Sequence, residues 1–117
     1  MTGVVSYHAG KCAEDSVAQL YLRSGQQVVA RRWRGTAGEI DVIVRDGDEV
    51  IFIEVKKSKS HALAAEHLSP RQMHRIYQTA AEFLGTEPGG QDTPSRFDVA
   101  LVDSIGRIEI LQNAFAA

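Results

Sequence analysis

The sequence predicts an α/β fold in which a mixed central sheet is flanked by helices, with its elements in the order αβββαββ. Two observations favour this class. Apolar residues recur at helical spacing in two segments, near residues 10–24 and 70–84, and the remaining apolar runs are short and bounded by glycine and other turn formers. A chain of 117 residues is long enough to bury one core, so we expect one domain spanning residues 1–117.

The first predicted helix covers about residues 10–24, and Gly25 suits the left-handed position that ends many helices. Its apolar positions are spaced by three and four residues: Ala13, Val17, Leu20 and Tyr21. Residues 27–34 mix apolar and basic side chains in an extended pattern, so they predict the first strand. A hairpin over residues 38–57 follows, and Asp46-Gly47 is its predicted turn because both residue types tolerate positive φ.

Residues 57–67 are polar and rich in alanine without a clear period, which indicates a mobile loop or a short irregular helix. The next helix has a strong start signal, because Ser69 can cap it, Pro70 suits its first position and Gln72 completes a capping box. An apolar stripe continues it to Gly85: Met73, Ile76, Tyr77, Ala80 and Leu84. A surface loop to residue 95 and two strands, 97–102 and 107–111, complete the prediction.

The composition limits the classes of protein and the compartment. No apolar run is long enough to cross a bilayer and no secretory signal is visible, so we expect no membrane association. Cys12 is the one cysteine and cannot form an internal disulfide, which is typical of the cytoplasm. The net charge of −2 argues against a protein that binds nucleic acid by bulk electrostatics alone.

The hairpin carries three carboxylates and an ammonium group inside two apolar strands. Alternation places Glu39 and Asp41 on one face with Ile43, while Ile40, Val42 and Val44 take the other. Phe52, Glu54 and Lys56 share a face of the returning strand. The Asp46-Gly47 turn would pair Arg45 with Asp48, set Glu39 opposite Glu54 and make Asp41 and Glu54 diagonal neighbours, roughly 7–8 Å apart.

Three acids that converge in this way destabilise a sheet unless they take up a proton or bind a cation. Mg²⁺ or Mn²⁺ accepts one or two carboxylates together with substrate phosphates, so the pattern predicts a divalent metal site. Lys56 would lie beside the metal and stabilise developing negative charge. The alternative is a solvated, salt-bridged strand face without a metal.

These residues resemble two known groups of proteins. Asp41, a spacer and Glu54-Val55-Lys56 resemble the motif of the PD-(D/E)XK nuclease superfamily, with its restriction-endonuclease-like core. More narrowly, the stretches 38–41, 52–56 and 96–99 resemble the YraN-like family of small bacterial proteins. The proline of the superfamily motif is replaced, since Glu39-Ile40-Asp41 stands in its place, and Gln72 occupies a position where many relatives carry lysine.

The resemblance implies a catalytic site of Asp41, Glu54 and Lys56, with Glu39 and the helix-borne Glu14 as further metal ligands. Relatives with this core include Holliday-junction resolvases, and many of them form homodimers. Glu14 has a structural alternative as an acid near a helix N-terminus. Nucleic-acid contacts are expected from five basic residues: Arg31, Arg32, Arg34, Lys57 and Lys59. A core-facing Trp33 flanked by solvated arginines is the competing interpretation.

The predicted function is that of a Mg²⁺-dependent or Mn²⁺-dependent endonuclease acting on DNA, with a structured or branched substrate favoured over a sequence-specific one. DNA is favoured over RNA as the partner. A non-catalytic nucleic-acid-binding or assembly module that keeps the nuclease fold is the main alternative, and a protein-interaction domain using the open edge of its sheet is a third. A zinc site is not expected, because the histidines lack zinc-motif spacing and one cysteine is available to help them.

Overall fold

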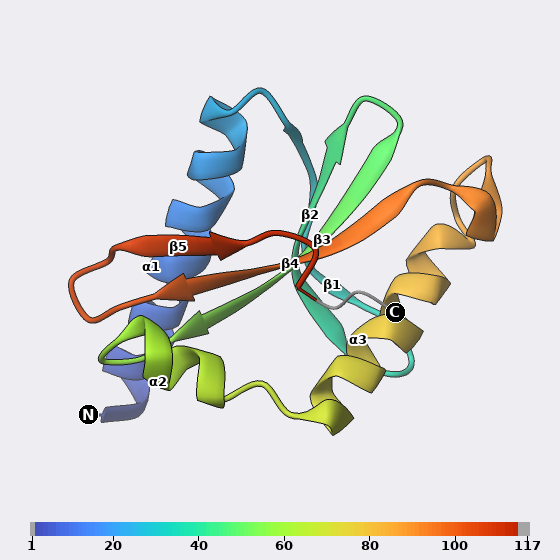
Figure 1. The fold of residues 1–117 in the computed structure, drawn as a ribbon. Helices are drawn as coiled ribbons and strands as arrows, with labels where there is room; N and C mark the ends of the chain where they lie inside the picture. The colour runs from blue at the N-terminus through green and yellow to red at the C-terminus, as the bar shows by residue number, and fades with distance from the viewer. Residues whose placement is uncertain (1, 115–117) are drawn as a thin grey trace.

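The computed structural model describes the backbone of residues 2–114 and the side chains of residues 12–114. Its elements in chain order are α1 (Thr2–Arg23), β1 (Gln27–Arg34), β2 (Glu39–Asp46), β3 (Glu49–Lys57), α2 (His61–Glu66), α3 (Pro70–Leu84), the short 3-10 helix η1 (Gly90–Asp92), β4 (Ser95–Val102) and β5 (Ile108–Leu111). The predicted α/β class is confirmed: a mixed five-stranded sheet carries helices on both sides (Figure 1).

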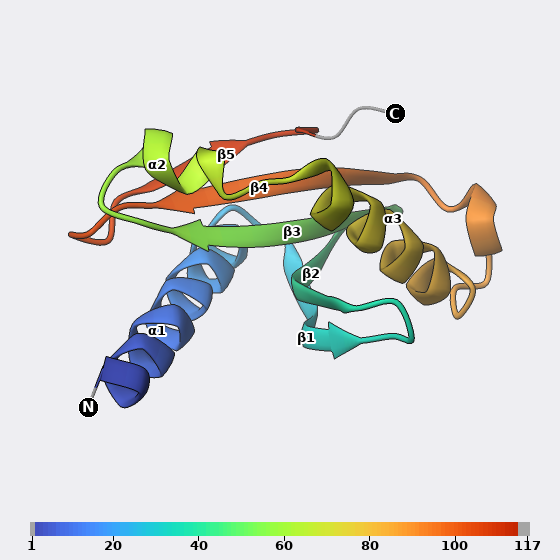
Figure 2. The same ribbon diagram turned by 90° about the horizontal axis from the view of Figure 1, so that it is seen from below.

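The strands are arranged in chain order across the sheet, from β1 at one edge to β5 at the other. β3 and β4 are parallel, while the other three neighbouring pairs are antiparallel. A parallel pair needs a crossover connection, and α2 and α3 supply it. Figure 2 shows the result, with α1 on one side of the sheet and α2 and α3 on the other.

The two faces of the sheet bury different side chains. On the α1 face, Val17 and Tyr21 pack with residues of β2, β3 and β4 such as Val42 and Ile53. On the opposite face Phe52 is the centre of an aromatic cluster, with its ring centroid 5.8 Å from that of Phe83 on α3 and 5.3 Å from that of Phe97 on β4. Both faces are therefore closed by apolar contacts, so a charged side chain in the middle strands is costly unless it is paired or hydrogen-bonded.

Local sequence signals placed most elements correctly. The bounds of β1 are as predicted, and α3 begins where Ser69 caps it by accepting the Gln72 N–H at 3.1 Å. Residues 61–66 form the short helix that was one of two alternatives. α1 begins at Thr2, well before the predicted residue 10. The prediction missed these first turns because the apolar stripe starts only at Ala13. Within residues 2–114 none of the helices combines the length and hydropathy needed to cross a membrane.

The predicted hairpin turn was wrong by one residue. Asp46 pairs with Glu49, so the two turn residues are Gly47 and Asp48. Gly47 has φ of 60° at the first central position, as a type II′ turn requires, whereas the prediction had assigned that position to Asp46. The shift moves every cross-strand pair: Val42 faces Ile53, and the next step of the same register brings Asp41 level with Glu54.

Candidate metal centre

The candidate site lies where β2 separates from β3. Regular pairing between these strands ends at Val42 and Ile53, and Figure 2 shows β1 and β2 turning away from β3, β4 and β5. Just beyond the last pair, the Asp41 carboxylate takes the place of a backbone carbonyl of a neighbouring strand and accepts the backbone N–H of Val55 at 2.8 Å. This bond satisfies a donor that the departing strand would leave open, and it fixes the Asp41 side chain beside Glu54.

Glu54 is 8% exposed and its carboxyl group hydrogen-bonds with that of Asp41. Burial, this hydrogen bond and the charge of Asp41 raise the pKa of Glu54 to about 10, while Lys56 opposes the shift. At neutral pH the two carboxyl groups therefore hold one proton between them. Such a pair has two ways to lose its repulsion, a shared proton or a bound cation.

Lys56 lies two residues beyond Glu54 on β3, and alternation puts both on the same face of the sheet. Their partners on β4, Val99 and Leu101, are buried against α2 and α3, which identifies that face. The charge of Lys56 lowers the pKa of Glu54, so the ammonium group lies within electrostatic reach of the pair. Asp41, Glu54 and Lys56 are thus brought together as predicted, whereas Lys57 and Lys59 are exposed beyond them.

Glu14 approaches the same region from α1. Its side chain is buried, with the residue 9% exposed, and its Oε2 accepts a hydrogen bond from Arg32 Nε at 2.8 Å. The charge of Glu14 is also among the causes that raise the pKa of Glu54. The helix therefore contributes a third acid near the carboxylate pair, and an arginine of β1 neutralises it.

Arg32 holds this position with an unusual backbone. Its φ is 49°, in the left-handed region that costs a residue such as arginine about 1 kcal/mol or more. Arg31 binds Asp15 and Arg32 binds Glu14, so two successive side chains leave β1 toward α1, and Trp33 then enters the α3-side core. The alternation of β1 changes phase at Arg32.

β2 changes phase at the same level. Alternation predicted that Ile40 would share a face with Val42 and Val44, but Ile40 packs in the α3-side cluster with Ile43. The sheet is distorted where Arg32 and Asp41 pass each other, since the regular pairs between β1 and β2 stop at Arg31 and resume at Trp33. Distortions of this kind concentrate at functional sites.

The predicted convergence of Glu39 with Asp41 and Glu54 was wrong. Glu39 forms an ion pair with Arg34 at 3.2 Å, and among the side chains of residues 12–114 no three acids, histidines or cysteines are grouped so that they could hold a metal ion. The physical reason is the one-residue shift of the turn together with the phase change in β2. Both separate Glu39 from the position opposite Glu54 that the prediction gave it.

The three arginines predicted to grip phosphate all have carboxylate partners. Arg31 binds Asp15, Arg32 binds Glu14 and Arg34 binds Glu39. Trp33, the candidate for base stacking, packs edge-on against Phe83 with ring centroids 5.4 Å apart. The structural interpretation of Trp33 is therefore confirmed.

The donor set fits a hard divalent cation. Mg²⁺ commonly binds through one or two carboxylates and fills its remaining positions with water and substrate phosphate, and Asp41 and Glu54 supply two carboxylates in contact with each other. Mn²⁺ accepts the same oxygen donors. Asp41 and Glu54 offer no nitrogen or sulfur ligand, which structural zinc sites commonly use.

The loop between β1 and β2 positions the start of β2 through contacts that no sequence pattern indicates. Glu82 of α3 accepts the Thr36 N–H at 2.8 Å and also binds the Thr36 hydroxyl. A Cβ added to Gly35 would lie 1.8 Å from Glu82 Oε2, so glycine makes room for this carboxylate. α3 thereby fixes the loop from which β2 carries Asp41 toward β3.

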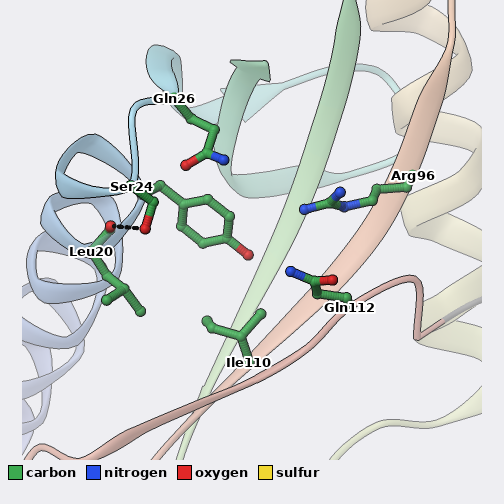
Figure 3. Close-up of a pocket in the computed structure, with 7 residues that line it drawn as sticks. Leu20, Ser24, Gln26, Arg96, Ile110 and Gln112 are labelled. Atoms are coloured by element: carbon green, nitrogen blue, oxygen red, sulfur yellow. Dashed lines mark hydrogen bonds between the residues drawn. The ribbon is translucent and has the colours of Figure 1, made fainter.

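A second acidic centre lies on the α1 face. Asp98 of β4 is fully buried and accepts hydrogen bonds from Tyr21 Oη at 2.7 Å, Arg96 Nε at 3.1 Å and the Asn113 N–H at 2.9 Å. Burial and the bond to Asp98 raise the pKa of Tyr21, so the phenol stays a donor. Figure 3 shows the shallow pocket of about 190 Å³ beside this centre, with Arg96 and Gln112 facing Leu20 and Ser24. Asp98 has its donors within the protein.

Comparison with known proteins gives a consistent family. The family model described as "Uncharacterised protein family UPF0102" matches residues 13–102. A UPF0102 protein of Cereibacter sphaeroides is 68% identical over 117 residues and covers 100% of both chains. One of Ruegeria pomeroyi is 58% identical over 113 residues, 97% of this chain and 92% of its own. One of Dinoroseobacter shibae is 46% identical over 105 residues, 90% of this chain and 78% of its own.

Proposed function

The chain belongs to the UPF0102 family, as the YraN-like resemblance predicted, and we propose that it is a metal-dependent nuclease that hydrolyses phosphodiester bonds in DNA. Structured or branched DNA is the proposed substrate class. One observation carries the proposal: Asp41 and the buried Glu54 are held in contact, with the Lys56 ammonium on the same face as Glu54. The PD-(D/E)XK resemblance assigns these three positions to catalysis.

Asp41 and Glu54 would hold Mg²⁺ or Mn²⁺. The metal supplies Lewis-acid activation of a water and of the scissile phosphate. The Val55 N–H donates to Asp41 Oδ2 and would hold this carboxylate in a fixed orientation for the role. Lys56 would hold a phosphate oxygen and stabilise the charge that develops on it. Glu54, in contact with Asp41, would exchange its shared proton for the ion.

The test is cleavage of a labelled four-way DNA junction by purified protein with Mg²⁺ or Mn²⁺, read on a denaturing gel. Asp41→Asn and Glu54→Gln keep the shape of each side chain and remove its charge, so each should lower the rate by about a hundredfold or more. Glu109→Gln is the matched control, since this acid of β5 has a half-exposed side chain and pairs only with His61 among the contacts described. A rate unchanged by either site variant would refute the proposal.

A second candidate is a nucleic-acid-binding or assembly module without catalysis. Its support is that Arg31, Arg32 and Arg34 are all neutralised by acids, which leaves β1 without an evident excess of positive charge. Titration with Mn²⁺ separates the two candidates. The nuclease must bind the ion through Asp41 and Glu54, whereas the module binds DNA equally well in EDTA. The resemblance also implies a homodimer, which sedimentation equilibrium measures directly.

A further inference from the structure

The ion pair between Glu14 and Arg32 depends on an unfavourable, left-handed backbone at Arg32, which an ordinary structural ion pair does not need. Two described residues other than glycine have positive φ, Arg32 and Asn113. Asparagine tolerates the left-handed region, and Asn113 uses it to donate its N–H to Asp98. Arginine does not favour that region, so its presence at position 32 indicates that the guanidinium group itself is required there.

Three further facts define what this guanidinium does. It binds Glu14, and the register of β1 and β2, with Arg31 opposite Val42 and Trp33 opposite Ile40, puts Arg32 level with Asp41 at the border of the proposed metal site. Its side chain is 40% exposed, so solvent and a ligand can reach it. Two carboxylates of the site, Asp41 and Glu54, are in contact, but no third acid among residues 12–114 is grouped with them, and Glu14 is held by Arg32 instead.

We propose that the Arg32–Glu14 ion pair is a latch that a nucleic-acid phosphate opens. Arg32 exchanges the Glu14 carboxylate for a phosphodiester oxygen, and the released Glu14 joins Asp41 and Glu54 as a third carboxylate for the divalent ion. The exchange keeps the guanidinium paired with an anion throughout, and guanidinium groups match phosphate as well as carboxylate. DNA binding and metal binding then strengthen each other. This inference rests on the proposed function.

The linkage has a definite sign and a measurable size. A ligand that removes the partner of Glu14 makes that acid available to the ion, so the ion must in turn tighten DNA binding by the same factor. Coupling of this kind is typically about tenfold. Arg32→Asn mimics the open latch, because asparagine lacks the cation and tolerates the left-handed backbone.

The experiment measures Mn²⁺ affinity from the EPR signal of the free ion, alone and with a four-way DNA junction, after subtraction of the signal change with DNA alone. Wild type should bind Mn²⁺ about tenfold more tightly with the junction. Arg32→Asn should bind at the tighter level without DNA and gain nothing from it. Glu14→Gln should stay at the weaker level in both conditions. Cut and intact DNA both present phosphodiesters, so turnover does not disturb the comparison.

Arg45→Asn is the matched control, since it removes a guanidinium whose ion pair with Glu87 is about as buried as that of Arg32 with Glu14 and lies outside the proposed metal site. It should leave the Mn²⁺ affinity and its dependence on DNA unchanged. Mn²⁺ binding that needs Asp41 and Glu54 but is equal with and without DNA, or is weakened by Arg32→Asn, overturns the latch alone. Absence of any Mn²⁺ binding that depends on Asp41 and Glu54 overturns the proposed function instead. A melting curve establishes that each variant is folded.

Discussion

Two buried acids on neighbouring strands, Asp98 on β4 and Glu54 on β3, have opposite surroundings. Asp98 receives donors from a phenol, a guanidinium and a backbone N–H. Glu54 is almost as deeply buried, but the group that it contacts is another carboxyl, that of Asp41. The fold depends on a buried charge that is fully paired, because loss of one partner strands the other, whereas an acid pair without a cation is kept at the expense of stability. The structural centre at Asp98 and the proposed metal centre at Glu54 thus place opposite demands on the same sheet.

The largest expected effect concerns the structural centre. Asp98→Asn leaves the half-buried Arg96 without its main counter-charge and removes the charge that Tyr21 and the Asn113 N–H bind, so we expect a loss of roughly 3 kcal/mol in the free energy of unfolding, measured in urea. Glu49→Gln removes the other, more exposed partner of Arg96 and should cost under about 1 kcal/mol. Equal effects of the two substitutions would show that Asp98 is not the centre of this network.

The next effect is the pH dependence of stability caused by Glu54. Its pKa is about 10 in the folded protein and 4.5 ordinarily, so between these values the folded state holds a proton that the unfolded state releases. Stability therefore falls as the pH rises through this window, by about 1.4 kcal/mol for each pH unit.

Glu54→Gln removes the titrating group and keeps the side chain's shape. In EDTA, the variant should match or exceed wild type at pH 8 and show a flatter dependence on pH in urea unfolding. Glu109→Gln, on exposed surface, should retain the wild-type slope. Parallel curves for wild type and Glu54→Gln would mean that the carboxyl pair does not share a proton.

A divalent ion should distinguish the two centres directly. At a concentration ten times its Kd, Mn²⁺ stabilises a protein with one site by about 1.4 kcal/mol, which raises Tm by roughly 4–6 °C for a domain of this size. The shift should disappear in Asp41→Asn and persist in Asp98→Asn at its lower Tm. A shift retained in Asp41→Asn would place the ion elsewhere.

Sequence patterns predicted what depends on neighbours along the chain. The capped start of α3, the bounds of β1 and the common face of Glu54 and Lys56 follow from residue type and alternation, and the structure agrees. The hairpin composition was also sufficient to single out Asp41 and Glu54. These features need no knowledge of distant contacts, because capping and side-chain alternation are local properties of the backbone.

The rest could not be predicted for reasons that are also physical. Both Asp46 and Gly47 suit a turn, and a turn shifted by one residue moves every cross-strand partner by two positions, so the surroundings of Glu39 were beyond reach. The left-handed backbone of Arg32 could not be predicted either, because arginine is not a residue type that favours positive φ. The bond from Tyr21 to Asp98 joins residues 77 positions apart, which only the folded sheet brings together.

The smallest expected effect tests how the loop between β1 and β2 supports the functional centre. Gly35→Ala would push its methyl group into the Glu82 carboxylate and weaken the bond to the Thr36 N–H, at a cost of about 1 kcal/mol. Because that loop leads into β2 and Asp41, Mn²⁺ affinity should fall as well, while the Asp98 centre on the other face is unaffected.

The expected effect of Gly35→Ala depends on Glu82, so a double-mutant cycle of these two positions tests it. In a Glu82→Ala background the added methyl group loses its clash with the carboxylate and keeps a tight contact with Trp33 at 3.2 Å, so Gly35→Ala should then cost less stability and Mn²⁺ affinity. If the two substitutions are additive, the loop is held by other contacts and Glu82 does not position Asp41. A coupling of about 1 kcal/mol, accompanied by loss of Mn²⁺ affinity in both single variants, would mean that α3 determines where the carboxylate pair forms although it contributes no ligand to it.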